Sequence, residues 1–249
     1  MELQQNKSLI RESTISLYAG APKCWRHDSA TAWVSAERAA LAHFQQEGWP
    51  GDSGEGKIVL SLIKAASFIE LPTTHRSTFV EAIYSNNIAV IDVREHNIKL
   101  GIDPETPASP LVEAFNKKQT AGLISPSDMI ANILKASEQR ILNNFKIMTG
   151  PGSHTLSFFP TLTPENMLGL YNALGNQRLS QIAEVFSIAP YLLRSGWPDL
   201  TLWRGSEVAF KEIKAPGDRP RGNQIQTIEM VLLPLGFDVE FVRVVPAAS

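Results

Sequence analysis

The chain has 249 residues, of which 43% are hydrophobic and 19% are charged, and its formal net charge is −2. This length allows one large domain or two small ones, and the composition is typical of a soluble globular protein. The near-neutral charge excludes the global basic field of many nucleic-acid binders, so a nucleic-acid partner would need a local basic patch. The single Cys24 excludes an internal disulfide and favours a reducing compartment, so we expect a cytoplasmic location.

Several other classes of protein are disfavoured by what the sequence lacks. No apolar run approaches the roughly 20 residues needed to span a bilayer, so we expect no membrane contact. The first residues, "MELQQNKSLIREST", have no apolar core of the kind found in secretory signals. The five histidines are scattered without metal-ligand spacing, which disfavours a His/Cys zinc site.

The first 150 residues are predicted to be mainly helical. Apolar spacing predicts an amphipathic helix over 31–46. A second helix is expected from about Gly54, after the glycine-rich "GWPGDSGEG", which places Glu55 close to the helix N-terminus. Further elements are a strand in 86–95, a turn and short helix in 106–115, and one long helix over 125–148 capped by Ser125 or Ser127.

The composition and the expected secondary structure change after residue 150. Gly and Pro cluster in 150–166, which marks a candidate boundary between a helical portion, 1–150, and a core, 151–249, unless the two form one continuous domain. The elements expected after it are a helix pair, a β-hairpin, a helix and a closing strand: 164–175, 179–193, 200–203, 208–215, 223–236 and 238–245.

The hairpin carries the residues with the clearest chemistry. Alternation places Glu212 and Lys214 on one face of the second strand, and the hairpin brings Asp199, at the head of the first strand, beside Glu212. Two carboxylates, the backbone carbonyl of Ile213 and waters form a plausible Mg²⁺ or Mn²⁺ shell. Taken singly, an E-x-K triplet is more often a solvated face or a cross-strand ion pair, and "PD" is usually a turn.

Three blocks of the sequence resemble the VRR-NUC domain, a branch of the PD-(D/E)xK nucleases. They are "RSGWPDLTLW", "VAFKEIKAPGDR" and "NQIQTIEMVLLPLGFDVEFVRVV". Upstream, "ERAALAHFQQEGWPGDSGEGKIVLSLIKAASF" and "ENMLGLYNALGNQRLSQIAEVF" are similar to the catalytic end of the Fanconi-associated nuclease family. The resemblance implies an α/β fold, with a restriction-endonuclease-like mixed sheet flanked by helices and a mainly helical N-terminal portion packed on it.

The resemblance also implies roles for single residues. Asp199 and Glu212 match the metal-binding acids, Lys214 the catalytic lysine and Gln224 the glutamine of the following helix. Glu55 matches the acid of the G-E-G element and would add a carboxylate to the metal site. Glu55 could equally be a first-turn acid favoured by the helix dipole, and Gln224 could be a surface residue of its helix.

The full-length repair nucleases of that family carry DNA-binding regions with no counterpart here. Phosphate contacts are therefore expected from Arg194, Arg219 and Arg221, which lie close to the hairpin in sequence. Trp197 either stacks on an unpaired base or belongs to the core, and Trp203 is expected in the core.

These features predict a metal-dependent DNA nuclease acting on branched, flapped or otherwise structured DNA. Three alternatives stay open at this point: an antibacterial DNase toxin delivered into a target cell and neutralised by an immunity protein, an RNase, and a non-catalytic DNA- or protein-binding module. The intact acids and lysine argue against the last. The N-terminal helices favour a monomer.

Overall fold

The computed structural model describes residues 10–20, 23–28, 32–84, 91–120 and 122–247. Its centre is a six-stranded sheet with the strand order β2-β1-β6-β5-β4-β3. β6 pairs in parallel with β1 and with β5, and the pairs β1–β2, β4–β5 and β3–β4 are antiparallel. The strands are β1 Arg11–Ala19, β2 Trp25–Arg26, β3 Gly51–Asp52, β4 Leu200–Arg204, β5 Glu207–Lys214 and β6 Asp238–Pro246.

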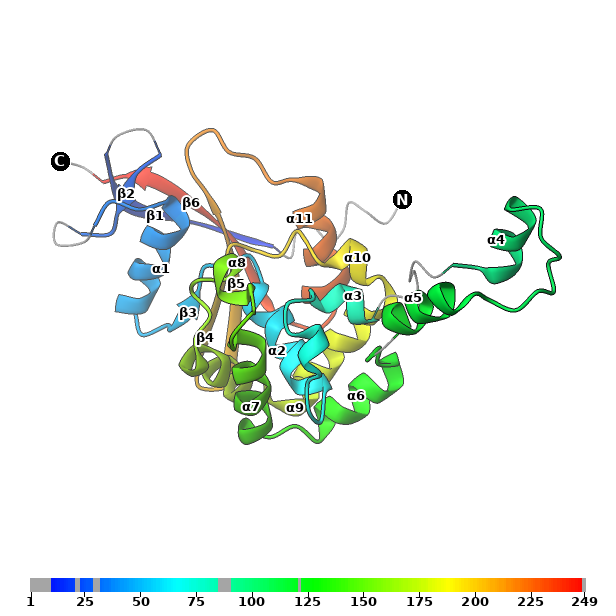
Figure 1. Cartoon of the computed structure of the whole chain (residues 1–249). Helices are drawn as coiled ribbons and strands as arrows, with labels where there is room; N and C mark the ends of the chain where they lie inside the picture. Colours follow the sequence, from blue (N-terminus) through cyan, green and yellow to red (C-terminus); the bar gives the residue numbers. More distant parts are fainter. Residues whose placement is uncertain (1–9, 21–22, 29–31, 85–90, 121, 248–249) are drawn as a thin grey trace.

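Helices cover both faces of the sheet (Figure 1). They are α1 Ala36–Gln46, α2 Lys57–Ser67, α3 Val80–Tyr84, α4 Val93–Lys99, α5 Pro110–Thr120, α6 Pro126–Leu134, α7 Glu138–Thr149, α8 Thr155–Phe158, α9 Pro164–Ile188, α10 Pro190–Leu193 and α11 Gly222–Thr227, with a 3₁₀ turn at Thr73–His75 and a π-helical turn at Ile228–Leu232. In the part of the chain that the structure describes, none of these is long and apolar enough to cross a membrane.

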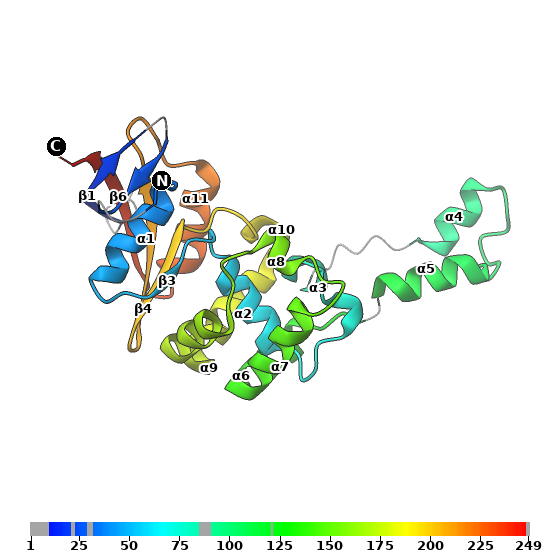
Figure 2. The ribbon, with the colours of Figure 1, turned by 60° about the vertical axis from the view of Figure 1, so that its left-hand side comes forward.

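Two hydrophobic cores follow from the alternation of side chains along the strands. Phe210 and Phe241 face the larger core, which α2, α6, α7 and α9 complete. Ile213 and Val242 face the smaller one, where α1 contributes Phe44. The expected α/β fold, a mixed sheet flanked by helices, is confirmed. Figure 2 shows that α4 and α5 extend away from these layers.

The N-terminal strand β1 was not expected from the sequence. Its segment "RESTISLYA" has only two buried positions, so its apolar signal is weak. It becomes a strand because β6 offers a partner edge, with Ser13 opposite Val242. β1–β3 precede residue 150 and β4–β6 follow it, so the sheet is shared between 1–150 and 151–249. That sharing favours one continuous body.

Two predictions of local structure were wrong, and polar caps explain both. The helix expected over 125–148 is broken into α6 and α7, because Ser137 accepts a hydrogen bond from the amide of Arg140 at 3.3 Å and starts a new helix. Ser125, not Ser127, caps α6. Of the strand expected over 86–95, residues 86–90 lie outside the described residues, and α4 begins at Val93 under an Asp92 cap.

The other expected elements are present. The helix pair before the hairpin is α9, whose two halves meet at Gly175, where φ is 64° and ψ is 172°. The final helix is α11 continued by the π-helical turn. The strands β4, β5 and β6 follow the predicted order.

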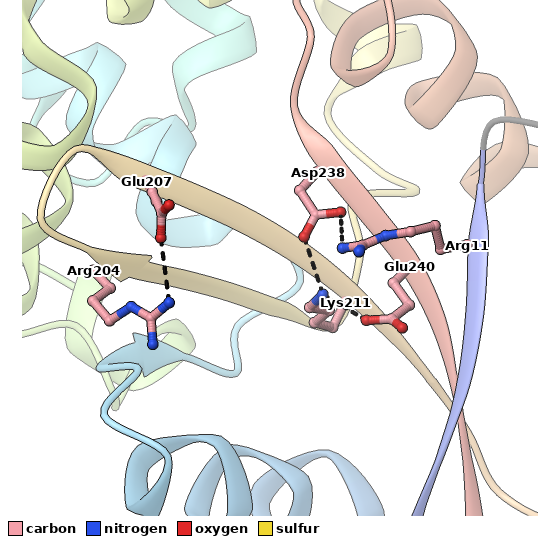
Figure 3. Close-up of polar contacts among 6 residues, drawn as sticks. All are labelled: Arg11, Arg204, Glu207, Lys211, Asp238 and Glu240. Carbon is pink, nitrogen blue, oxygen red and sulfur yellow. Dashed lines mark hydrogen bonds and ion pairs between the residues drawn. The ribbon is translucent and has the colours of Figure 1, made fainter.

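A partly buried ion cluster joins three strands of the sheet (Figure 3). The ammonium group of Lys211 on β5 lies 2.6 Å from a carboxylate oxygen of Glu240 and 3.3 Å from one of Asp238, both on β6. Asp238 also pairs with Arg11 of β1. The Lys211 and Glu240 side chains are only 9% and 13% exposed, so each charge depends on the other for its solvation.

We expect Lys211→Ala to destabilise the protein by about 3 kcal/mol, because it leaves the Glu240 carboxylate largely buried without its cation. Urea unfolding would measure the change. Arg204→Ala is the matched control: Arg204 pairs with Glu207 at the exposed turn of the same hairpin, and its loss should cost less than about 1 kcal/mol. Equal costs for the two variants would contradict a desolvated cluster.

Candidate active site

The β4–β5 hairpin brings two acids together. Leu200 pairs with Lys211, so continuing the register places Asp199 opposite Glu212. One carboxylate oxygen of Asp199 accepts a hydrogen bond from the backbone amide of Ile213 at 2.8 Å. Asp199 is 9% exposed and Glu212 only 1%. The pairing that alternation predicted is therefore present, at the buried end of the hairpin.

Burial dominates the electrostatics of this pair. Desolvation, followed by the negative charge of Glu212, raises the pKa of Asp199 to about 8. Desolvation also raises the pKa of Glu212, although the hydrogen bond and charge of Lys214 oppose this. Two adjacent buried carboxyls cannot both ionise cheaply, so the site favours either a proton or a cation between them.

Lys214 and Gln224 hold one oxygen of Glu212. The Lys214 ammonium lies 2.7 Å from Oε1 of Glu212 and 3.1 Å from Oε1 of Gln224. The Gln224 amide nitrogen donates to the same Glu212 oxygen, and the Gln224 carbonyl oxygen accepts from the Arg221 amide at 2.8 Å. Gln224 therefore faces the hairpin from the start of α11 and orients both charged groups.

The second oxygen of Glu212 depends on the neighbouring Asp199. Oε2 is buried, and no N–H group of the described residues donates to it; the Asp199 carboxyl is the hydrogen-bonding neighbour of Glu212. When both acids are ionised this oxygen is left unsatisfied, a costly state for a carboxylate. A hard divalent cation satisfies such an oxygen directly. The donors present therefore fit Mg²⁺ or Mn²⁺, with Asp199 and Glu212 as the acids. The backbone carbonyl of Ile213 stays a predicted ligand.

Glu55 approaches the pair through its backbone. Its amide donates to the Asp199 carbonyl at 3.3 Å, its φ is 52°, and its side chain is exposed. Over the described ranges, no three His, Cys, Asp or Glu side chains are grouped as a metal site would require. The role of Glu55 as a third metal-binding carboxylate stays a prediction.

Glu37 is an acid near the site that sequence reasoning missed. It lies in the first turn of α1, and its negative charge contributes to the raised pKa of Asp199. Glu37, Glu55 and Asp199 line one cavity of about 300 Å³. The signal was present, since Glu37 opens the amphipathic stretch "ERAALAHF", but a first-turn glutamate in such a helix is ordinary.

Two glycines allow the loops of the site to pack closely. Gly56 has φ 71°, and a Cβ there would lie 2.3 Å from the ring of Trp197. Gly196 has φ 83°, and a Cβ there would lie 2.2 Å from the backbone oxygen of Asn223. These contacts hold the G-E-G turn and the start of α11 against the loop that carries Asp199.

Trp197 and Trp203 both belong to the core. Trp197 is 1% exposed and donates from its indole nitrogen to the Leu193 carbonyl at 2.7 Å, so stacking on a base is excluded for it. Trp203 is 6% exposed, as expected.

The three arginines predicted to contact phosphates lie on the surface. Arg194 packs over the Tyr191 ring and forms an ion pair with Glu81 at 3.4 Å. Arg219 and Arg221 are exposed in the loop after β5, and Arg221 begins α11. Gln224 links that loop to Lys214. Contact of these arginines with DNA stays a prediction.

Comparison with solved structures gives the fold. Two crystal structures of paFAN1, bound to DNA with a gap and a 5′ flap of two nucleotides or of one, match 96% of this chain with a TM-score of 0.61 and 18% sequence identity. The chain has a FAN1-like fold. It spans 38% of the paFAN1 chain. No protein-family model and no curated protein matches the sequence.

The close approach of the Asn223 backbone predicts that Gly196 tolerates no side chain. Gly196→Ala should cost about 3 kcal/mol, from the left-handed backbone and the clash with Asn223. Gly217→Ala should cost only about 1 kcal/mol, because Gly217 has φ 90° but nothing within 4 Å of an added Cβ. Urea unfolding of both variants checks the difference. Equal costs would refute the close approach.

The raised pKa of Asp199 predicts that the stability of the metal-free protein depends on pH. An unfolded aspartate titrates near 4, so between about pH 4 and pH 8 the folded state holds a proton at Asp199 that the unfolded state has released. The free energy of unfolding in EDTA should therefore fall as pH rises through this window. Asp199→Asn should make the slope shallower.

The control for this slope is Glu207→Gln, at the exposed turn of the same hairpin, where the carboxylate is 64% exposed. It should leave the slope as in the wild type. A wild-type stability that rises from pH 4 to pH 8 would contradict the desolvated pair.

Proposed function

We propose that the chain is a divalent-metal-dependent nuclease that hydrolyses phosphodiester bonds in DNA. The observation that supports this most is the buried Asp199–Glu212 pair, in which Lys214 bonds to one Glu212 oxygen and no N–H group of the described residues donates to the other, so that only a proton or a cation shared with Asp199 satisfies it. DNA with a 5′ flap is the proposed substrate, because the FAN1 structures with this fold contain such DNA. The chain spans only 38% of paFAN1, so the DNA bound by paFAN1 is not by itself the substrate of this chain. The preference of this chain for flap DNA over other DNA structures is therefore proposed as well.

Asp199 and Glu212 would hold Mg²⁺ or Mn²⁺, with the Ile213 carbonyl and Glu55 as proposed further ligands. A bound cation of this kind supplies a Lewis acid and lowers the pKa of a coordinated water. The pair suits this role because a cation would offset both the desolvation and the repulsion from Glu212 that raise the Asp199 pKa.

Lys214 is the proposed electrostatic partner of the reacting phosphate. Its ammonium is fixed by Glu212 and Gln224, and the side chain is 9% exposed. A positive charge that is already oriented in a partly dry site stabilises charge developing on phosphate oxygens without reorganisation. Gln224 acts through Lys214 and Glu212, and is a positioning residue.

Arg194, Arg219 and Arg221 are proposed to contact the DNA backbone. Arg219 and Arg221 are exposed on the loop that leaves β5, which brings guanidinium groups near the hairpin. Such contacts position a strand and carry no sequence preference.

Cleavage of labelled 5′-flap, duplex and single-stranded DNA tests the proposal. The wild type should cut with Mg²⁺ or Mn²⁺ and not in EDTA. Asp199→Asn should remove metal binding and cutting together, and Lys214→Gln should lower the cleavage rate at least about 100-fold, the effect of losing one oriented donor to a developing oxyanion.

Arg204→Gln is the control, because Arg204 is an exposed cation at the far end of the same hairpin; it should cut like the wild type. Circular dichroism would establish that each variant is folded. Absence of cutting by folded wild type, on these DNAs and then on RNA, would leave a binding module as the better hypothesis.

A further inference from the structure

A second cavity lies beside the candidate active site. Its volume is about 310 Å³, within the range of sites for small ligands. Its walls are mainly apolar: Leu60 of α2, Val80 of α3, Met148 of α7, and the three phenylalanines Phe79, Phe158 and Phe159. None of these residues has a part in the proposed chemistry.

The three phenylalanines form one aromatic cluster. The ring centroid of Phe79 lies 5.7 Å from that of Phe158 and 5.9 Å from that of Phe159, and those of Phe158 and Phe159 are 6.4 Å apart. Phe79 is 46% exposed and Phe158 is 58% exposed. Rings this open present faces to solvent that a planar ligand can cover.

The aromatic cavity borders the cavity of the acids. Lys57, Phe158 and Phe159 line both, and the other cavity contains Asp199. The Lys57 ammonium lies 5.9 Å from the centre of the Phe159 ring. A strand whose phosphate lies at Asp199 would therefore have Lys57 and the aromatic rings as its next neighbours.

The charges at the rim suit a nucleotide. Lys57 stands between the two cavities, and Arg194 lines the aromatic one, where Glu81 pairs with it. Lys64 also lines it, but its ammonium donates to the backbone carbonyls of His75, at 2.6 Å, and of Thr78. Lys64 therefore fixes the loop that precedes Phe79 and leaves the phosphate contacts to Lys57 and Arg194.

We propose that the aromatic cavity holds an unpaired base of the DNA strand whose phosphodiester is positioned at Asp199, with Lys57 on the connecting phosphate. This rests on the proposed nuclease function and specifies its substrate: the strand must have at least one unpaired nucleotide next to the bond that is cut. Fully paired DNA keeps its bases stacked inside the helix and has none to offer to the rings.

Binding in EDTA tests the base pocket separately from cleavage. The probe is a gapped duplex with a short 5′ flap that carries 2-aminopurine at one unpaired position per molecule. We expect the fluorescence to change on binding at one position only, where the base meets the rings. Phe158→Ala should abolish this change and weaken binding about 5- to 150-fold, the factor that corresponds to stacking of about 1–3 kcal/mol per base.

Phe115→Ala is the matched control. Phe115 is also a partly exposed phenylalanine, at 40%, but it lies on α5, which extends away from the site (Figure 2). This variant should bind and fluoresce like the wild type. Affinity for fully paired duplex should be the same in all three proteins. Wild-type affinity for flap DNA in folded Phe158→Ala, or an equal loss on paired duplex, would overturn the proposal.

The two proposals fail in different ways. Position-specific fluorescence that depends on Phe158, without any cleavage in Mg²⁺ or Mn²⁺, would retain the base pocket and reject the nuclease. Metal-dependent cleavage that needs Asp199, together with flap DNA that Phe158→Ala binds and cuts as well as the wild type, would retain the nuclease and reject the pocket.

Discussion

The site depends on two carboxyl groups that are kept out of water at one end of a hairpin. Antiparallel pairing of β4 with β5 places Asp199 against Glu212, and burial by both hydrophobic cores removes the solvent that would otherwise screen them. Their raised pKa values are the measure of this cost. A fold keeps such a pair at a functional site because the unfavourable charge becomes binding energy for a cation.

The same strand carries two buried lysines whose surroundings differ. Lys211 is matched by Glu240 and Asp238, and Asp238 is itself paired with Arg11, so that cluster is close to saturated and joins strands (Figure 3). Lys214, three residues later and on the opposite face, shares one oxygen of Glu212 with Gln224, and no N–H group of the described residues donates to the other oxygen. The cluster on one face of β5 links strands, and the pair on the other face is the candidate site.

Close backbone packing holds segments that are distant in sequence against β5. Gly56 under Trp197 and Gly196 against Asn223 bring the G-E-G turn and the start of α11 to the hairpin. The same packing places the aromatic cavity, built from α2, α3, α7 and the segment around α8, next to the acids. The proposed chemistry of the hairpin and the proposed base pocket are thereby neighbours.

The local pattern of the sequence was sufficient for the hairpin, for the position of Asp199 opposite Glu212 and for Lys214 on the same face as Glu212, because strand alternation and a short turn leave little freedom. It was also sufficient for most helices, whose apolar spacing is strong. Local caps at Asp92 and Ser137 overrode the pattern in two places, since one polar hydrogen bond outweighs a weak propensity.

Tertiary structure decided what depends on distant partners. β1 has too few apolar residues to be found alone and exists through its pairing with β6. Glu37 acquires significance only because α1 packs near Asp199. The burial of Trp197 and the meeting of Phe79 with Phe158 and Phe159 likewise join residues far apart in the chain. The sequence determines which charged groups one hairpin brings together, because strand pairing is local. Packing between remote segments decides how far these groups are shielded from water and which residues lie beside them.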